Sequence, residues 1–333
     1  MCLIRFVFFC RPLLAEKVYN DYGEEASMID NINWYPGHMK KTRELIQNNM
    51  KMVDAVIEVI DARIPVSSRN PIIDELVSAK PRIIAINKSD LADEKANRAW
   101  KQKLTSKPDN AKAGETQAVI MNSLTGEGTK QLFSSFEKKA AERTGSSAIK
   151  PYRLMIVGVP NCGKSSLINR LTGHKSAKTG DRPGVTKGKQ WLTLENGMQL
   201  LDTPGILWPK FEDPKAGVNL AFCGSIKDEI LDVPTLALEL IKVLTERYPE
   251  LLLERYKLDE LLGEGDESPE TGYPIETDTD AALANMHQMA LKRGCILPGK
   301  RIDYERMGRL LLDEFRSAKI GRITLEWPEG GDD

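Results

Sequence analysis

The chain has 333 residues, and its 47 basic and 48 acidic side chains leave a formal net charge of −1. A hydrophobic share of 41% beside 29% charged residues is typical of a globular protein and excludes a chain that is disordered throughout. The length predicts more than one domain, because single cores stop growing at roughly 250 to 300 residues.

The first 31 residues are expected to lie outside the folded protein. They begin with an apolar stretch, but Arg5 and Arg11 interrupt it, and no uncharged run reaches the roughly 20 residues of a membrane span. We interpret residues 1–31 as a disordered extension or as an overlong start before a natural first residue at Met28. A signal peptide or an organelle presequence is the less favoured alternative.

Short apolar runs alternate with helical patterns from about residue 32 onward. Such runs, separated by segments of helix length, indicate a largely parallel sheet covered on both faces, which is a doubly wound α/β fold. We expect this α/β domain over residues 32–220 and, because the strand pattern then stops, a smaller all-helical domain over 221–328. The expected strands span 52–60, 82–87, 117–122, 153–158, 190–194 and 198–202.

The tetrapeptide N-K-S-D at 87–90 follows the second expected strand and is typical of a guanine-reading loop. The carboxylate of Asp90 can accept hydrogen bonds from the ring N–H and the exocyclic amine of guanine, whereas adenine presents no amine there. Asn87 is expected to brace the loop and contact the base, and the stem of Lys88 to lie over the ring. Ser89 belongs to the same binding loop.

A loop of small residues, N-S-L-T-G-E-G at 122–128, follows the third expected strand. We expect Asn122 and the backbone of Ser123 and Leu124 to contact the guanine oxygen. An ordinary turn between a strand and a helix is the alternative interpretation.

The pattern G-x-x-x-x-G-K-[ST] at 158–165 lies between an apolar strand and an amphipathic helix, which is the context of a phosphate-binding loop. Its glycines let the backbone wrap a phosphate, whose charge meets the N–H groups at the start of the helix. Lys164 is expected to reach the β and γ phosphates and assist catalysis, and the Ser165 hydroxyl to ligate Mg²⁺. The expected nucleotide contacts of this loop are Asn161, Cys162, Gly163, Lys164, Ser165 and Ser166.

Two further elements are predicted to sense the γ-phosphate. The segment 178–189 is basic and rich in glycine, and Thr186 within it is expected to complete the Mg²⁺ shell and act in catalysis. The D-T-P-G sequence at 202–205 ends an expected strand, so Asp202 would hold Mg²⁺ through water and the Gly205 N–H would meet the γ-phosphate.

The base-reading motif precedes the phosphate-binding loop in this chain, whereas ordinary small GTPases run from the phosphate loop toward the base motif. The order therefore predicts a circularly permuted GTPase. The loop after D-T-P-G would then lead straight into the helical domain, and GTP and GDP would orient that domain differently.

A basic stretch over 287–322 carries nine Lys and Arg against four acidic residues. Its density predicts contacts to RNA phosphates, although a solvated helix face is the alternative. The candidate RNA-binding residues are Lys292, Arg293, Lys300, Arg301 and Arg309.

The segments NWYPGHMKKTRELI (33–46), VIDARIPVSSRNP (59–71), NKSD, GVPNCGKSSLINRL, TGDRPGVT and LLDTPGILWPKFED (200–213) read in order like the ribosome biogenesis GTPase A family. The resemblance runs from about residue 32 to about 328. It implies hydrolysis of GTP with Mg²⁺, stimulated by the precursor of the large (50S) ribosomal subunit, with the helical domain contacting ribosomal RNA.

Catalysis is expected to depart from that of GTPases with a glutamine after the D-x-x-G glycine, because Ile206 occupies that place and cannot hydrogen-bond a water. The resemblance points instead to His38 of W-Y-P-G-H-M, in a segment expected to be flexible; a packing or RNA-contacting role is the alternative. Asn161 resembles the phosphate-loop asparagine of GTPases that depend on a monovalent cation, which implies a K⁺ ion.

We therefore predict a GTPase that acts as a nucleotide-dependent switch on the large ribosomal subunit precursor and its rRNA, slow alone and stimulated by the subunit. The alternative is a GTP-gated RNA-binding or ribosome-binding module with negligible hydrolysis. We expect a monomer without a membrane partner, in the bacterial cytoplasm or alternatively the mitochondrial matrix. Scattered cysteines without C-x-x-C spacing agree with a reducing compartment.

Overall fold

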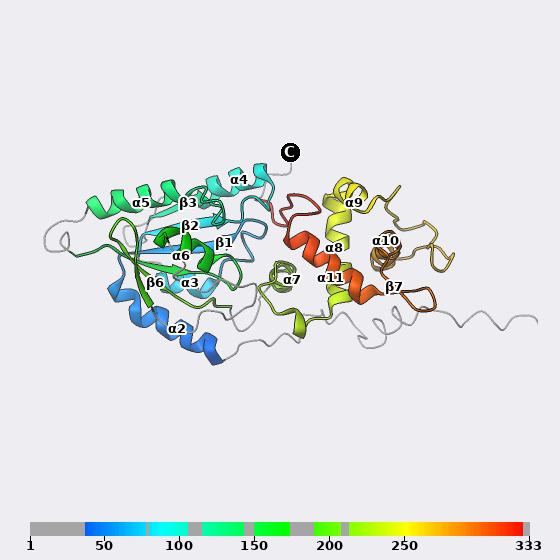
Figure 1. Ribbon diagram of the computed structural model, residues 1–333, viewed down its shortest axis with the longest axis horizontal. Coiled ribbons are helices and arrows are strands. Elements are labelled where there is room, and N and C mark those ends of the chain that lie inside the picture. The colour runs from blue at the N-terminus through cyan, green and yellow to red at the C-terminus, as the bar shows by residue number, and fades with distance from the viewer. Residues whose placement is uncertain are drawn as a thin grey trace, which may run out of the picture.

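A six-stranded sheet forms one half of the molecule in this computed structural model, which describes residues 37–77, 80–105, 115–142, 150–173, 190–207 and 213–328 (Figure 1). The spatial order is β3-β2-β1-β4-β6-β5, and neighbours are parallel except for β5 and β6. The strands are β1 (Ala55–Asp61), β2 (Arg82–Asn87), β3 (Thr116–Ile120), β4 (Arg153–Val157), β5 (Gln190–Thr193) and β6 (Gln199–Asp202).

The strand order confirms the circular permutation. β4, which precedes the phosphate-binding loop, lies inside the sheet between β1 and β6 although it is fourth in the chain. β1 and β2, which lead to the base-reading motif, come before it in sequence. Because parallel neighbours place their carboxyl ends on the same edge, the loops after β1, β2, β3, β4 and β6 meet at one edge of the sheet.

Helices cover both faces of the sheet, as the apolar strands predict. Ile84 and Ile86 of β2 pack with Trp100 of α4, whereas Ile83 and Ala85 belong to the main core, together with side chains of α5 and α6. Successive strand residues point to opposite faces, so these helices lie on opposite sides. The helices of this half are α2 (Gly37–Asn49), α3 (Pro71–Val77), α4 (Glu94–Leu104), α5 (Thr129–Ala141) and α6 (Lys164–Thr172).

The second half is built around α8 (Val233–Arg247), which contacts α7, α9, α10 and α11. Side chains cap these helices where the sequence offers short polar residues: Asp232 accepts from the Thr235 N–H, Thr277 from Asp280, and Asp303 from Arg306. The expected all-helical half also holds a short hairpin of β7 (Ile296–Leu297) and β8 (Arg301–Ile302). Its other helices are α7 (Pro214–Phe222), α9 (Pro249–Tyr256), α10 (Asp278–Arg293) and α11 (Tyr304–Arg316).

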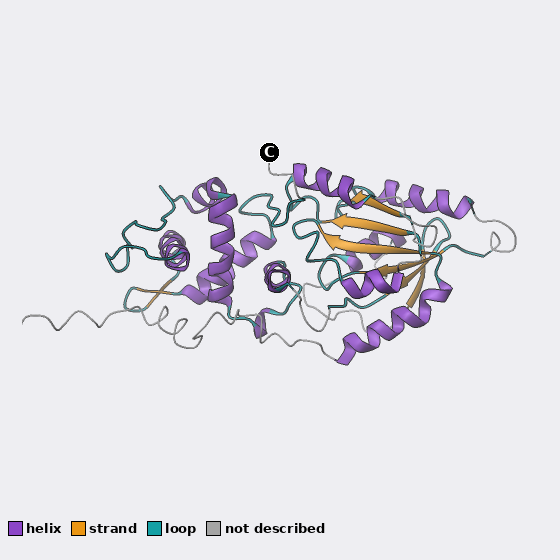
Figure 2. Ribbon diagram, turned by 180° about the vertical axis from the view of Figure 1, so that it is seen from behind, coloured by secondary structure: helices purple, strands orange, loops and turns teal. Residues whose placement is uncertain are grey.

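The strand arrowheads in Figure 2 point toward the helical half, so the loop edge of the sheet faces the joint between the two halves. Within the described ranges, no helix combines the length and apolar character that crossing a membrane requires.

A buried ion pair lies at this joint. The Arg63 side chain is 1% exposed and donates from Nε and Nη2 to the Asp61 carboxylate at 2.9 and 2.8 Å. Its guanidinium also lies 5.2 Å from the ring centroid of Phe315, and Nη1 donates to the Arg316 carbonyl of α11. One side chain therefore links the end of β1 to the helical half.

Replacing Arg63 by Ala is expected to lower the free energy of unfolding by about 2–4 kcal/mol, because the buried Asp61 carboxylate loses its main partner. Urea denaturation of the full chain measures the effect. Arg98→Ala, which removes an exposed helix ion pair, serves as the control and is expected to cost under about 0.5 kcal/mol. Equal stability of the two variants would show that the buried pair contributes nothing.

Candidate functional site

The phosphate-binding loop leaves β4 at Gly158 and enters α6 at Lys164. Gly158 has φ +150°, and a Cβ there would lie 2.3 Å from the Val59 carbonyl oxygen. Gly163 has φ +95°, and a Cβ there would lie 2.2 Å from the Asn87 amide nitrogen. Both glycines are therefore required by close approach as well as by backbone conformation.

Lys164 and the D-T-P-G turn meet at this loop. The Lys164 ammonium donates to the carbonyls of Gly158 at 3.0 Å and Val159 at 2.7 Å. A Cβ on Gly205 would lie 2.8 Å from Pro160 and 3.0 Å from the Lys164 nitrogen. The glycine thus lets the turn after β6 touch the phosphate loop.

Asp202 offers an acceptor that suits a hydrated Mg²⁺ ion. The residue is 5% exposed, and its Oδ1 atom has no hydrogen-bond partner among the residues that the structure describes. Burial raises the pKa of Asp202 to about 6, against the opposing effects of the Lys164 charge and the Thr203 N–H. With Ser165 in the first turn of α6, this carboxylate would hold the ion, which supplies charge compensation to the phosphates; Thr186 lies outside the described residues.

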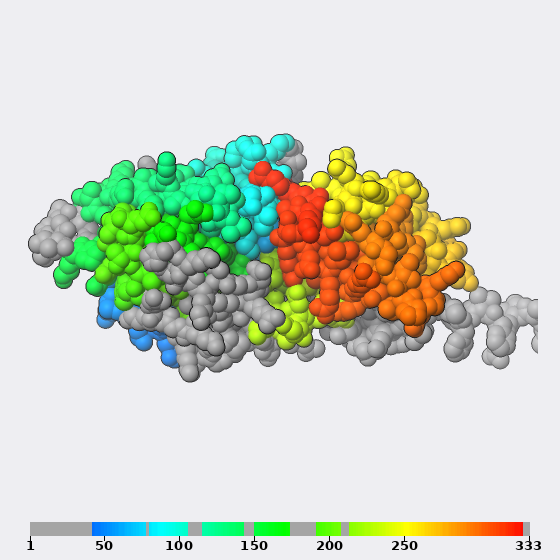
Figure 3. Space-filling view, in the orientation of Figure 1, coloured from blue at the N-terminus to red at the C-terminus, as the bar shows by residue number. Residues whose placement is uncertain are grey.

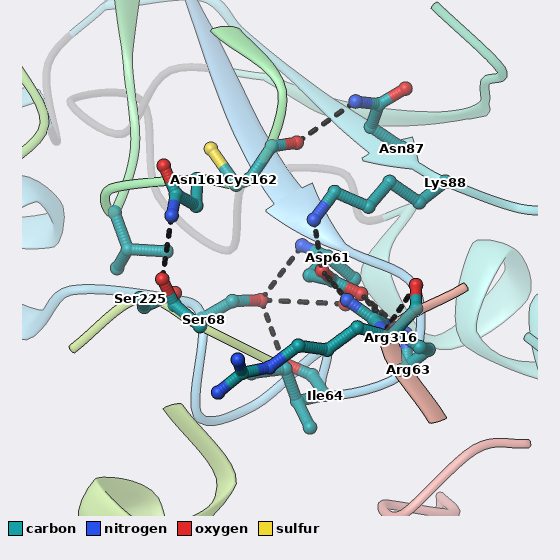
Figure 4. Close-up of polar contacts among 12 residues, drawn as sticks. Asp61, Arg63, Ile64, Ser68, Asn87, Lys88, Asn161, Cys162, Ser225 and Arg316 are labelled. Carbon is teal, nitrogen blue, oxygen red and sulfur yellow. Dashed lines mark hydrogen bonds and ion pairs between the residues drawn. The ribbon is translucent and has the colours of Figure 1, made fainter. Parts of the chain in front are cut away.

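Asn87 connects three loops of the site, and its contact with Cys162 is visible in Figure 4. Its side-chain N–H donates to the Cys162 carbonyl of the phosphate loop at 2.8 Å. Its Oδ1 accepts from the Ser123 backbone N–H at 3.0 Å and from the Ser123 hydroxyl at 2.7 Å. The amide thereby fixes the base-reading loop relative to the phosphate loop and to the loop at 122–128.

The rest of the base-reading loop is shaped by its backbone and by Asp61. Lys88 has φ +60°, a left-handed conformation that is unusual for a residue with a side chain. Its ammonium lies 3.0 Å from Asp61 Oδ2 (Figure 4), Ser89 is buried, and Asp90 is exposed, where it can meet a ligand. Burial alone would raise the pKa of Asp61, but Arg63 and Lys88 together hold it below its ordinary value.

Hydrogen bonds within the loop at 122–128 and from Arg170 of α6 fix the conformation of this loop. Asn122 Oδ1 accepts from the N–H groups of Leu124 and Thr125, and the Leu124 side chain is 74% exposed. Arg170 donates to the carbonyls of Ser123 and Leu124. Arg170 did not stand out in the sequence, because nothing in an ordinary helix face signals such a contact.

Ile206 occupies the position of the catalytic glutamine of other GTPases, and its side chain cannot hydrogen-bond a water molecule. Ile206 is fully buried, its N–H donates to the Gly158 carbonyl at 3.3 Å, and its carbonyl accepts from the buried Asn70 amide at 3.1 Å. The backbone of His38 lies in the first turn of α2, whereas the sequence predicts a flexible segment there. Helical periodicity extends to this histidine because M-K-K-T-R-E-L-I continues directly from it.

Asn161 links the phosphate loop to the helical half. It has φ +57°, and its side-chain N–H donates to the Gly224 carbonyl beyond α7 at 2.6 Å. The hydroxyl of the neighbouring Ser225 donates to the Pro160 carbonyl at 2.8 Å. Ser166 follows Ser165 in α6. Cys162 is buried, and burial raises the pKa of its thiol, so the thiol stays protonated and the backbone of Cys162 is the part that can contact a ligand.

The basic residues of the helical half divide into two groups. Lys292, Lys300, Arg301 and Arg309 are exposed. Lys292 lies near the end of α10, Lys300 lies in the turn of the β7–β8 hairpin, and Arg301 begins β8. Arg293 instead donates to the Arg255 carbonyl at 3.2 Å and lies 3.4 Å from Glu314, which places it in an internal network. Arg293 differs from its neighbours because it lies on the buried face of α10, and the density of charge in the sequence does not show which face a residue occupies.

Comparison with known proteins agrees with this site. Residues 153–258 match the family described as 50S ribosome-binding GTPase. Ribosome biogenesis GTPase A of Priestia megaterium is 43% identical over 303 residues, covering 89% of this chain and 97% of the relative. That of Bacillus cereus is 41% identical over 303 residues, covering 90% and 94%. The GNP-bound structure of YlqF from T. maritima matches with a TM-score of 0.55 and 27% identity, covering 87% of this chain and 99% of that one.

Asp202→Asn is expected to stabilise the nucleotide-free protein at pH 7.5 by on the order of 1–3 kcal/mol. The pKa is raised from 3.8 to about 6 in the folded state, so the ionised carboxylate opposes folding above pH 6 and this penalty vanishes as the pH falls toward 4. Thermal unfolding across this pH range is the measurement. Mg²⁺ and a GTP analogue should reverse the order of the two proteins. A stability gap that widens on acidification would contradict the assigned environment of Asp202.

Proposed function

The chain belongs to the ribosome biogenesis GTPase A family and is a GTP-dependent ribosome assembly factor, and from that premise we propose that it acts as a nucleotide-controlled switch on the large-subunit precursor. The observation that carries the proposal is the meeting of three loops through Asn87. Asn87 joins the base loop, the phosphate loop and the loop at 122–128. The turn at Gly205 touches the phosphate loop at the same edge of the sheet, and that edge faces the helical half.

The proposed switch rests on the closeness of the turn at Gly205 and the phosphate loop to the helical half. Gly205 touches the phosphate loop, and α7 begins at Pro214 a few residues later. Asn161 of the phosphate loop is itself bonded to the Gly224 carbonyl at the other end of α7. A γ-phosphate that rearranges these loops would therefore shift α7, and with it the helices that α7 contacts.

We propose that the helical half contacts rRNA and that the sheet-containing half is the GTPase domain. Because α7 (Pro214–Phe222) packs on α8 and α11, we place the boundary near residue 213 rather than at the 220/221 expected from the sequence. Support comes from the four exposed cations, of which Lys300 and Arg301 belong to the β7–β8 hairpin and Lys292 lies near the end of α10. Phosphate contacts of this kind make binding fall steeply with salt. Arg293 is left out of this surface because Glu314 and the Arg255 carbonyl engage it.

The proposed binding residues of the nucleotide remain those of the four loops, with Mg²⁺ at Ser165, Asp202 and Thr186. We propose that the protein acts as a monomer in the cytoplasm, since the relatives described above are bacterial; the mitochondrial matrix remains the alternative. A GTP-gated binding module with little hydrolysis is the second candidate function, and the buried Ile206 favours it, because no water-orienting side chain stands in that place.

Multiple-turnover GTP hydrolysis with and without 50S particles distinguishes the two functions. We expect stimulation of at least about tenfold, and His38→Ala to remove most of it while leaving the affinity for a GTP analogue unchanged. Arg43→Ala, on the same helix, is the matched control and should keep the stimulation. Turnover that 50S particles do not raise supports the gated module, and full stimulation of His38→Ala excludes this histidine as the catalyst.

Replacing KCl by NaCl is expected to lower GTP turnover several-fold, because a K⁺ ion held by the Asn161 oxygen would share charge with the phosphates. Asn161→Ala should be equally slow in both salts. Equal turnover of the unaltered protein in NaCl and KCl would exclude the ion, and the choline salt provides the baseline without either cation.

A further inference from the structure

Residues 320–327, which we name the C-terminal segment, run from the end of α11 back to the base-reading side of the sheet. Figure 3 shows these last residues lying against the region of α4. The Ile323 N–H donates to the Leu91 carbonyl at 3.1 Å, and the Leu325 N–H to the Arg63 carbonyl at 2.8 Å. The segment thus lies along the turn that follows the base-reading motif.

Two side chains of the segment engage the backbone of that turn. Arg322 donates from Nε to the Ala92 carbonyl at 2.7 Å and from Nη2 to the Ser89 carbonyl at 3.0 Å. Thr324, which is fully buried, accepts from the Asp93 N–H at 3.0 Å. These contacts hold the backbone on both sides of Asp90, whose carboxylate is expected to read the base.

The segment is anchored on its other side as well. The hydroxyl of Tyr248, which lies between α8 and α9, donates to the Thr324 carbonyl at 2.8 Å and accepts from the Thr324 N–H at 3.1 Å. Glu326 accepts from the N–H groups of Val66 and Ser67, and Trp100 of α4 donates to the Glu326 carbonyl at 2.7 Å. Because hydrogen bonds hold it on both sides, the C-terminal segment has a fixed position against the base-reading turn.

The base-reading turn needs such support. Lys88 adopts φ +60°, which costs on the order of 1–2 kcal/mol for a residue with a side chain. Two hydrogen bonds to guanine also require both Asp90 oxygens in one plane at a fixed distance, and Asp90 itself is exposed. Without its hydrogen bonds to Arg322 and Thr324, the turn at 89–93 would let the Asp90 carboxylate change orientation while the overall fold stayed intact.

We propose that Arg322 and Thr324 are positioning residues of the guanine site, so that the segment beyond the helical half sets the affinity and selectivity for guanine nucleotides. The inference rests on the proposed binding of GTP through Asp90. Since the segment continues directly from α11, a partner that displaces the helical half would also loosen the base-reading turn and speed GDP release.

Arg322→Ala and Thr324→Val in the full chain provide the test, with affinities for GDP and for inosine diphosphate measured by titration. Inosine diphosphate lacks the exocyclic amine that Asp90 would bind. We expect GDP to bind about tenfold more weakly and inosine diphosphate to lose less, so that the preference for GDP falls. Arg322→Lys, which keeps one donor, should recover part of the loss.

The control and a double substitution separate positioning from general destabilisation. Arg98→Ala on α4 removes an exposed arginine that forms an ion pair with Glu94, and it should leave both affinities unchanged. In an Asp90→Ala background, Arg322→Ala should weaken GDP no further, because the group it positions is gone. An unchanged preference for GDP in both variants, or losses that add fully to that of Asp90→Ala, would overturn the inference. Asp90→Ala without effect on GDP would instead refute the proposed guanine site itself.

Discussion

The carboxylate of Asp61 is the charge around which the two halves of the molecule are arranged. It lies buried at the end of β1, where an unpaired carboxylate would cost several kcal/mol. Arg63 and Lys88 compensate it from opposite directions. Lys88 belongs to the base-reading loop, whereas Arg63 reaches Phe315 and the Arg316 carbonyl of α11. The base-reading loop and the helical half therefore depend on one buried carboxylate. Moving either Lys88 or Arg63 away would leave the buried Asp61 carboxylate less well compensated.

The phosphate end of the site has its own connection to the helical half. Asn161 binds the Gly224 carbonyl, and Arg316 donates to the Ala221 and Phe222 carbonyls at the end of the same helix, α7. Arg316 is in turn paired with Asp228 at 2.7 Å. The permuted chain order fits this arrangement, because the turn at 202–205, which we propose senses the γ-phosphate, comes shortly before α7 in the sequence. The base-reading loop, through Asp61 and Arg63, and the phosphate loop, through α7, are thus both linked to α11.

Much of the fold and of the site was predictable. The six strands and their largely parallel arrangement followed from runs of apolar residues, with β5 antiparallel to β6, and the permutation followed from motif order alone. The motifs at 87–90, 158–165 and 202–205 were found because each combines a local backbone requirement with chemistry that few residues supply. The hairpin β7–β8 was missed because two-residue strands leave no periodicity to read, and the helical start at His38 was missed because Gly37 suggested a flexible segment.

The sequence by itself determined the strands, the helices, the guanine and phosphate motifs and their permuted order, since all of these depend on residues close together in the chain. Only the tertiary structure decided which distant side chains complete the site. The Asn70 amide meets the Ile206 carbonyl across 136 positions, and Arg322 meets the Ser89 carbonyl across 233. Such contacts have no sequence signature, because they form wherever packing brings an unpaired carbonyl against a donor. The physical reason is that buried backbone groups must be satisfied, whereas the chain does not dictate locally which residue satisfies them.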